Sequence, residues 1–213
     1  MKTNSSQNFL SQICIWIGCY FVLSSCAIGG IEGNKPLVKI PKNSNMEVLR
    51  INLIYGETDN LFGLNIGLSN EVRHDLTGIQ IGILNRAKNG PFSIQVGLYN
   101  QLDGVGYAIR TGLINYGGKN SMYHQNIPIY LLGGVTLGAI NLDSEGGANV
   151  GIANLFVSGF NVGFLNVLTS GFTIGLINHG FGNTFSLGII NYCEFGPLYV
   201  MILANYCYYP DRE

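Results

Sequence analysis

Few side chains in this sequence combine the residue types and the spacing that catalysis or metal binding requires. The chain has three histidines, His74, His124 and His179. None has a second ligand at metal-binding spacing, such as a histidine one helical turn away or a nearby cysteine pair. His74 and Asp75 share a charged turn that would suit a metal or another ligand, but a solvated turn explains these residues more simply. We therefore predict no catalytic residue, no cofactor and no metal site.

Cys26 ends a segment that resembles the signal peptide of bacterial lipoproteins. Residues 13–23 form an apolar run that is shorter than the roughly twenty residues of a membrane-spanning helix and is typical of a signal sequence. The run closes on Leu23-Ser24-Ser25-Cys26, which matches the lipobox pattern of an aliphatic residue, two small residues and cysteine. We predict a signal peptide over residues 1–25, lipidation of Cys26, and a lipid-anchored tether over residues 26–46. An ordinary cleaved signal or an uncleaved anchor is the alternative.

Two further cysteines, Cys193 and Cys207, each follow an Asn-Tyr pair near the C-terminus. An exported protein folds in an oxidising compartment, where such a pair forms a disulfide. We predict a structural disulfide between them, with two free, partly buried thiols as the alternative. A redox site would need a closer pair, such as Cys-x-x-Cys.

Composition excludes some partners. The formal net charge is −1 and only 11% of residues are charged, so the surface offers no basic field for nucleic acid. The 30 glycines, with only 6 prolines and 47% hydrophobic residues, favour many tight turns over disorder.

The body of the chain repeats one short phrase, Gly-x-x-Asn. Nine copies end at Asn70, Asn85, Asn100, Asn115, Asn141, Asn154, Asn166, Asn178 and Asn191. A tenth, degenerate copy ends at Asn205, with Ile202 in the place of glycine. The steps in residue number from one asparagine to the next are 15, 15, 15, 26, 13, 12, 12, 13 and 14. Such regular spacing predicts a repeat domain over residues 47–208, and the step of 26 indicates one repeat plus an insertion.

Each copy also alternates with a period of two, which is typical of a β-strand. In the copy at residues 160–166, we expect Phe160, Val162, Phe164 and Asn166 on one face and Asn161, Gly163 and Leu165 on the other. The sequence therefore predicts an all-β repeat protein with one strand per about 12–15 residues.

Two architectures fit such strands. In a parallel β-solenoid each repeat is one coil, and stacking would give an aliphatic ladder inside and an asparagine ladder at a corner. In an antiparallel meander or β-barrel the aliphatic face would meet lipid or a core. The constant polarity pattern and the matching positions of Cys193 and Cys207 slightly favour the solenoid. The shortest coils, however, are small for three inward side chains such as Phe160, Val162 and Phe164.

The insertion, at about residues 116–130, breaks the array and is rich in aromatic residues. Its candidate binding residues are Tyr116, Lys119, Tyr123, His124 and Tyr130. Aromatic loops on rigid scaffolds often bind partners, although a plain connecting loop is the simpler interpretation.

The lipobox, the segment LRINLIYG and the phrases GLNIGLSN, GIQIGILN, VGLYN and GLINHG together resemble the leptospiral surface-repeat lipoprotein family. The likeness spans about residues 20–208. It implies a lipid-anchored, surface-exposed lipoprotein of the bacterial outer membrane without enzymatic activity, and the only functional residue that it implies is Cys26.

We therefore expect a non-catalytic cell-envelope lipoprotein with an interaction, adhesion or structural role. Its expected partners are the membrane, through the anchor, and an unidentified protein or host-surface ligand. An integral outer-membrane β-barrel, acting as a channel or channel component, is the alternative.

Overall fold

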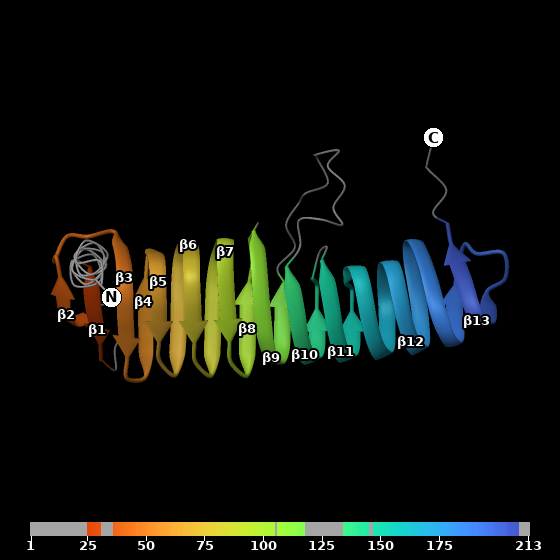
Figure 1. Ribbon diagram of the computed structural model, residues 1–213, viewed down its shortest axis with the longest axis horizontal. Coiled ribbons are helices and arrows are strands. Elements are labelled where there is room, and N and C mark those ends of the chain that lie inside the picture. Colours follow the sequence, from red (N-terminus) through yellow and green to blue (C-terminus); the bar gives the residue numbers. More distant parts are fainter. Residues whose placement is uncertain (1–24, 31–35, 105, 118–133, 145–146, 209–213) are drawn as a thin grey trace, which may run out of the picture.

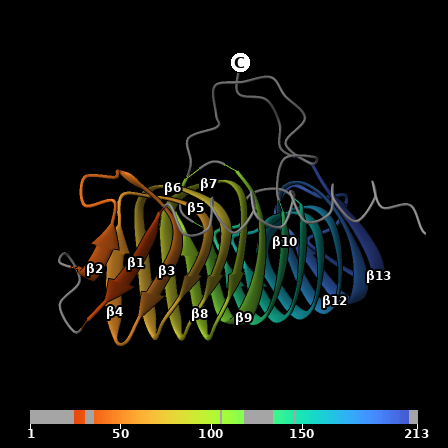
Figure 2. The ribbon, with the colours of Figure 1, turned by 60° about the vertical axis from the view of Figure 1, so that its left-hand side comes forward.

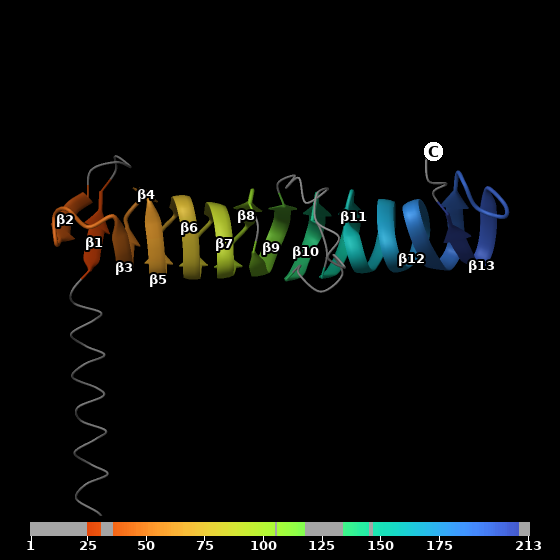
Figure 3. The same cartoon turned by 90° about the horizontal axis from the view of Figure 1, so that it is seen from above.

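The computed structural model of the protein describes residues 25–30, 36–104, 106–117, 134–144 and 147–208. Every regular element within these residues is a β-strand, and all belong to one 13-stranded sheet. The sheet winds into an elongated stack of coils, with β1 and β2 at one end and β13 at the other (Figure 1). Seen from above, the coils form a nearly straight row (Figure 3).

The strands follow one another along the stack in almost the order of the sequence. They are β1 (Cys26–Gly29), β2 (Pro36–Ile40), β3 (Met46–Asn52), β4 (Tyr55–Thr58), β5 (Asn60–Ile66), β6 (Ser69–Ile81), β7 (Leu84–Val96), β8 (Tyr99–Leu102), β9 (Tyr107–Gly117), β10 (Val135–Leu142), β11 (Ala148–Leu155), β12 (Ser158–Cys193) and β13 (Val200–Cys207). Among the described strands, only β1 with β2 and β12 with β13 pair in antiparallel fashion.

The predicted parallel β-solenoid is confirmed, and the alternative antiparallel meander or barrel is wrong. Neighbouring copies of the repeat align glycine with glycine and asparagine with asparagine. Between β10 and β11, for example, Gly138 pairs with Gly151 and Asn141 with Asn154. The sequence repeat is therefore one coil, and its length sets the circumference of that coil.

Each coil is flattened, with two faces joined by two turns (Figure 2). In the coil that starts at Thr77, residues 77–81 form the first face and residues 84–87 the second. A turn at Gly82 and Ile83 joins these faces, and we call the row of such turns along the solenoid the glycine edge. The opposite turn, at residues 88–91, closes the coil, and we call its row the far edge.

The expectation of an aliphatic ladder inside the coils is wrong, because the interior is polar and the large apolar side chains point outward. Asn161 and Asn166 are fully buried, whereas Phe160 is 44% and Phe164 is 62% exposed. The shortest coils have too little room for stacked phenylalanines. Short amide side chains fit the space, and each can bond its neighbours there, so burying them leaves few polar atoms unpaired.

Strict alternation also fails at the glycine edge. Asn161 and Gly163 point inward and Phe160, Val162 and Phe164 outward, but Leu165 is again outward and Asn166 inward. The turn after each glycine places two successive side chains on the outside, so both asparagines reach the interior. A period-two pattern cannot reveal such a phase change.

The wider coils that precede the insertion contain a cluster of buried apolar residues. Their longer repeats provide extra inward positions next to the far edge, and these positions form a buried cluster of Leu61, Val72, Leu76, Ala87, Leu102 and Ala108.

The expected tether over residues 26–46 is mostly folded. β1 pairs with β3 in parallel register, so that Cys26 lies opposite Leu49, and β2 pairs with β1. The first coil therefore starts at Cys26 itself. The predicted signal peptide, except for Ser25, lies outside the described residues.

The tenth copy of the repeat also differs from its prediction. β13 turns back and runs antiparallel to β12, with Thr184 opposite Cys207 and Tyr192 opposite Val200. Asn205 therefore bonds backbone oxygens of Asn191 and Leu198 instead of extending the asparagine stack.

Candidate functional surface

The asparagines of the repeat form a continuous hydrogen-bonded ladder inside the solenoid. Each side chain donates one amide hydrogen to the Oδ1 atom of the asparagine in the next coil. The distances are 3.0 Å from Asn70 to Asn85, 2.9 Å from Asn85 to Asn100 and 2.7 Å from Asn166 to Asn178. The second hydrogen goes to a backbone oxygen of the next coil, as from Asn85 to Val96 at 2.9 Å. The ladder therefore satisfies its own amides without water.

The ladder crosses the insertion without interruption. Asn115 of β9 donates to Asn141 of β10 over 3.1 Å, and the two strands pair directly. The longest interval between asparagines is therefore a single step of the ladder. The inserted residues 118–133 lie outside the described residues.

The glycine of each repeat gives the ladder its space. A Cβ atom on Gly97 would lie 2.2 Å from the backbone oxygen of Gly82 and 2.6 Å from Nδ2 of Asn85. These distances are far inside van der Waals contact. Because one contact is with backbone, a side-chain movement cannot relieve it. The Gly-x-x-Asn motif thus has a packing explanation: the asparagine uses the room that the glycine leaves.

A buried ion network starts the ladder. Asn52 of β3 donates to Asn70 over 2.9 Å and accepts a 2.8 Å hydrogen bond from Nε of Arg50. Arg50 in turn pairs with Glu47 at 2.8 Å, and Glu47 with Lys39 of β2 at 2.9 Å. These charges lie in β2 and β3, where they cap the ladder and join β2 to the solenoid.

A second polar row crosses the middle of the first face, and Arg110 is its exceptional member. Gln95 donates to Gln80 over 2.8 Å, and the next coil places Arg110 where they have glutamine. Arg110 donates to Ser144 at 2.9 Å and to Thr136 at 3.2 Å. Burial lowers the pKa of its guanidinium to about 10. Its Nε atom has no partner among the described residues.

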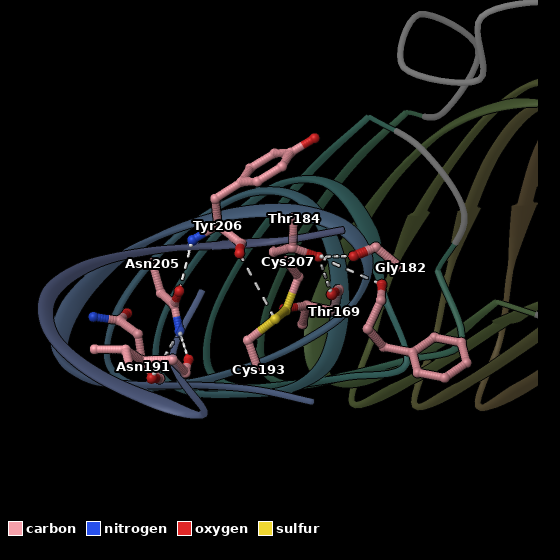
Figure 4. Close-up of a disulfide and its surroundings, with 10 residues drawn as sticks. Thr169, Gly182, Thr184, Asn191, Cys193, Asn205, Tyr206 and Cys207 are labelled. Atoms are coloured by element: carbon pink, nitrogen blue, oxygen red, sulfur yellow. Dashed lines mark hydrogen bonds between the residues drawn. A yellow bond between two sulfur atoms is a disulfide. The ribbon is translucent and has the colours of Figure 1, made fainter. Parts of the chain in front are cut away.

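The structure joins Cys193 and Cys207 by a disulfide inside the last coil (Figure 4). Their Cα atoms are 5.5 Å apart, and both residues are buried. The argument that parallel stacking would bring them together is wrong, because β13 runs antiparallel to β12. The bond instead crosses the interior, where it fastens the reversed strand to the coil beneath it.

Cys26 begins β1, which lies between β2 and β3 near one end of the solenoid. It is half-buried, and Ala27 and Ile28 alternate after it between buried and exposed. The backbone oxygen of Ser25 accepts hydrogen bonds from Val48 and Leu49, at 2.9 and 3.1 Å. Cutting the chain before Cys26 would remove these two bonds but leave the pairing of β1 with β3 in place.

The other sequence candidates do not converge on a site. His74 is exposed at the far edge, and its Nδ1 atom lies 2.9 Å from the backbone oxygen of Arg73. Asp75 accepts a 3.1 Å hydrogen bond from Asn89 of the next coil. Within the described part of the chain, no three potential ligands come together to hold a metal ion.

Only one of the five candidate binding residues of the insertion is described. Tyr116 lies in β9, and its backbone oxygen accepts a 2.9 Å hydrogen bond from Arg110. Lys119, Tyr123, His124 and Tyr130 lie outside the described residues.

The outer surface is strongly apolar, a feature that the sequence reasoning did not anticipate. The glycine edge carries an exposed row of Leu53, Leu68, Ile83, Leu98, Leu113, Ile152, Phe164, Leu176 and Ile189. An open groove of about 880 Å³ runs beside this row over the earlier coils, and its floor includes Gly67, Gly82, Gly97 and Gly112. On the first face, the rings of Phe160, Phe172 and Phe185 stack at 5.5 and 5.6 Å.

Charged side chains on the earlier coils lie toward the far edge. Arg73 pairs with Glu57 and reaches Asp59 at 4.0 Å. Tyr55 donates a 2.6 Å hydrogen bond to Glu71, and burial together with this bond raises the pKa of Tyr55 to about 12. The solenoid thus has one charged and one apolar edge in this region.

Within the described residues, the most extensive features that could contact a partner are rows of apolar side chains on the outer surface. The interior of the solenoid is filled by amides that bond each other, and its exterior presents aliphatic and aromatic rows at fixed spacing. No helix in the described part of the chain is long and apolar enough to cross a membrane. Comparison with protein-family models, curated proteins and solved structures finds no match for this chain.

The polar interior had a signal in the sequence. Asparagine recurs in all ten copies and glycine in nine, whereas the two residues between them vary among Leu, Ile, Phe, Tyr, Ala and Ser. Ladder positions demand one side chain and outward positions accept several, so invariance between copies marks the inside.

Proposed function

We propose that this protein is a non-catalytic lipoprotein of a bacterial cell envelope, held by lipid on Cys26 and acting through its outer surface in binding or envelope structure. The observation that carries the proposal is the combination of a lipobox with a solenoid whose interior polar groups hydrogen-bond to one another. An outer-membrane position agrees with the family resemblance of the repeats. The inserted segment, with Lys119, Tyr123, His124 and Tyr130, is a candidate for contact with a protein or host-surface ligand.

The position of Cys26 supports this proposal physically. Its side chain is on the outer side of β1, next to an inward-pointing, buried Ala27. A thioether-linked diacylglycerol there would extend away from the solenoid without disturbing the pairing of β1 and β3.

Metabolic labelling with palmitate tests the anchor. In cells that express the full chain, we expect label in the wild-type protein and none in the Cys26→Ala variant, which should also retain an uncleaved N-terminus. Cys14→Ala is the matched control and should label normally. Persistent labelling of Cys26→Ala would refute lipidation at this residue.

A further inference from the structure

We propose that the solenoid itself is embedded in the hydrocarbon layer of the membrane through the coils formed by residues 147–193, while the charged far edge of the earlier coils stays in water. This inference deepens the proposed function, on which it relies only for the presence of a bilayer near Cys26. The partner is bilayer hydrocarbon, and the contact is made by protein side chains in addition to the anchor.

The first supporting observation is that these coils expose large apolar side chains on every side, although Asn183 is also exposed. Phe164 is exposed at the glycine edge, Phe160 on the first face, Ile177 on the second face and Phe181 at the far edge. A second copy or another protein would cover one side of such a stack and leave the others in water. A surrounding apolar medium covers all four, because lipid adapts to the whole circumference.

The second observation is the distribution of charge. No Asp, Glu, Lys or Arg occurs between Glu145 and Glu194, a stretch that includes every residue of these coils. The earlier coils, in contrast, carry charges such as Arg73 and Lys88 at or near the far edge. Ionised side chains are strongly disfavoured among acyl chains, so their absence from exposed positions is what a lipid environment requires.

The third observation concerns backbone and side-chain polar groups. A segment in hydrocarbon must satisfy these groups internally. β11 and β12 are paired on both sides along the stack, and β13 with its disulfide closes the end. Asn154, Asn166 and Asn178 are fully buried and bonded to one another, so these three amides need no water. The buried Oδ1 atom of Asn149 is the exception, because it has no partner among the described residues.

The size of a coil also fits. Two packed strand layers are about 10 Å apart, whereas the hydrocarbon layer of a bilayer is about 30 Å thick. A solenoid that lies along the membrane can therefore sink its apolar coils among the acyl chains, in the manner of an interfacial amphipathic element. Because the first coil starts at Cys26, a lipid on this residue would hold the other end at the same membrane.

Tryptophan quenching by lipids brominated on their acyl chains tests the inference. The only tryptophan is Trp16, so a Trp16→Phe background gives a chain without this fluorophore. Into the full chain in this background we would introduce Phe164→Trp and Phe181→Trp, on opposite edges, with His74→Trp as the control on the charged edge. In reconstituted vesicles, brominated lipids should lower the emission of both Phe variants about two-fold, with little effect on the control.

Other outcomes would overturn the inference in distinguishable ways. Quenching of only one Phe variant would show that one side, and not the whole circumference, meets lipid. If the protein floats with the vesicles but shows no quenching, the result would agree with the Cys26 anchor and contradict the embedding of the coils. Quenching that persists in a Cys26→Ser background would support the embedding of the coils independently of the anchor. Lipidation of Cys26 is tested separately by palmitate labelling.

A charge variant gives a second readout that does not depend on tryptophan. Ile177→Glu places a carboxylate on the outward second face of the embedded coils, where it leaves the interior ladders untouched. In the Cys26→Ser background we expect this variant to lower vesicle partitioning roughly ten-fold or more. Arg86→Glu, on the same face of an earlier coil, is the matched control, and an equal effect of both variants would contradict the inference.

Discussion

At the scale of single residues, the molecule inverts the usual roles of polar and apolar side chains. Asparagine is the core residue here, because each amide donates and accepts along a stack that no aliphatic residue could replace. The leucines and phenylalanines that hydropathy alone would bury lie outside instead. The stability of the fold therefore depends mainly on satisfied hydrogen bonds in the interior. Mutations that leave interior polar groups unpaired should destabilise it most.

Removing one asparagine should be severely destabilising. Asn100→Ala leaves the donor of Asn85 and the acceptor of Asn115 without their partners in a buried space. Each of these two orphaned groups costs about 1–3 kcal/mol, so the free energy of unfolding should fall by about 2–6 kcal/mol. Chemical denaturation measures this loss. Thr111→Ala, which alters an exposed side chain near the same rung, should change little, and equal effects would refute the structural role of the ladder.

At the glycine edge, replacing glycine should lower stability more than replacing leucine, which reverses the usual ranking of these two residues. Gly97→Ala drives a methyl group into the backbone of the preceding coil and should reduce stability by about 1–3 kcal/mol or more. Leu98→Ala removes a larger side chain that is 57% exposed, and should change stability by no more than about 0.5 kcal/mol. Thermal unfolding of the two variants in the same detergent gives the ranking, and the opposite order would contradict the packing explanation.

Arg110 offers a substitution that should not destabilise. Arg110→Gln replaces a buried cation by the residue that occupies the two preceding coils, and Oε1 of Gln95 lacks a partner to accept from. Replacing a buried charge by a fitting neutral group is often neutral or stabilising by about 1–4 kcal/mol. Denaturation midpoints should therefore match or exceed those of the wild type. Arg110→Ala fills less of the space, so its denaturation midpoint should be lower than those of the wild type and of Arg110→Gln.

At the scale of elements, the disulfide should stabilise one end of the solenoid and not the whole. The reversed strand β13 is held by pairing with β12 and by the bond between Cys193 and Cys207. Replacing both cysteines by serine should remove about 3 kcal/mol, as expected for a cross-link that closes a loop of this size. Hydrogen exchange should then accelerate in β13 and the end of β12 but not in β6. Uniform acceleration would show that the coils unfold as one unit.

The sequence was sufficient to predict the strands and their stacking, because a fixed interval between asparagines is also the circumference of a coil. It was insufficient for the direction of the side chains, since strict alternation hides the double outward step at Phe164 and Leu165. The reversal of β13 was equally hidden. Its Asn-Tyr-Cys phrase copies that of the preceding repeat, and only the pairing partner distinguishes an added coil from a returning strand.

The candidate surface was less predictable than the fold. Apolar residues at outward positions have the same composition as a buried core, so the sequence cannot say which side of a strand faces solvent. The candidate residues of the inserted segment stay predictions, as does lipidation of Cys26. The absence of a catalytic or metal site likewise stays a prediction, based on the wide spacing of the few histidines and charged residues along the sequence.

At the scale of the whole molecule, the solenoid is a one-dimensional array in which each coil contacts its neighbours. It should therefore tolerate the loss of a complete coil. Deleting residues 160–171 joins Gly159 to Phe172 and brings Asn154 next to Asn178, in the register that the lost coil had with its neighbours. We expect unchanged β-type circular dichroism per residue and cooperative unfolding. Deleting residues 160–167 breaks the register and should abolish the fold, and equal tolerance of both deletions would contradict this view.

All the amides of the asparagine ladder point the same way, because each side chain donates to the asparagine of the next coil toward the C-terminus. Aligned amide dipoles add, as they do along an α-helix, so the stack carries a negative pole at β3 and a positive pole at β12. Arg50 donates into the negative pole through Asn52, and the backbone oxygen of Met201 in β13 accepts from Asn191 at the positive pole. The two ends of the ladder therefore need caps of opposite character, a cationic donor at the β3 end and an acceptor oxygen at the β12 end, and the protein supplies both.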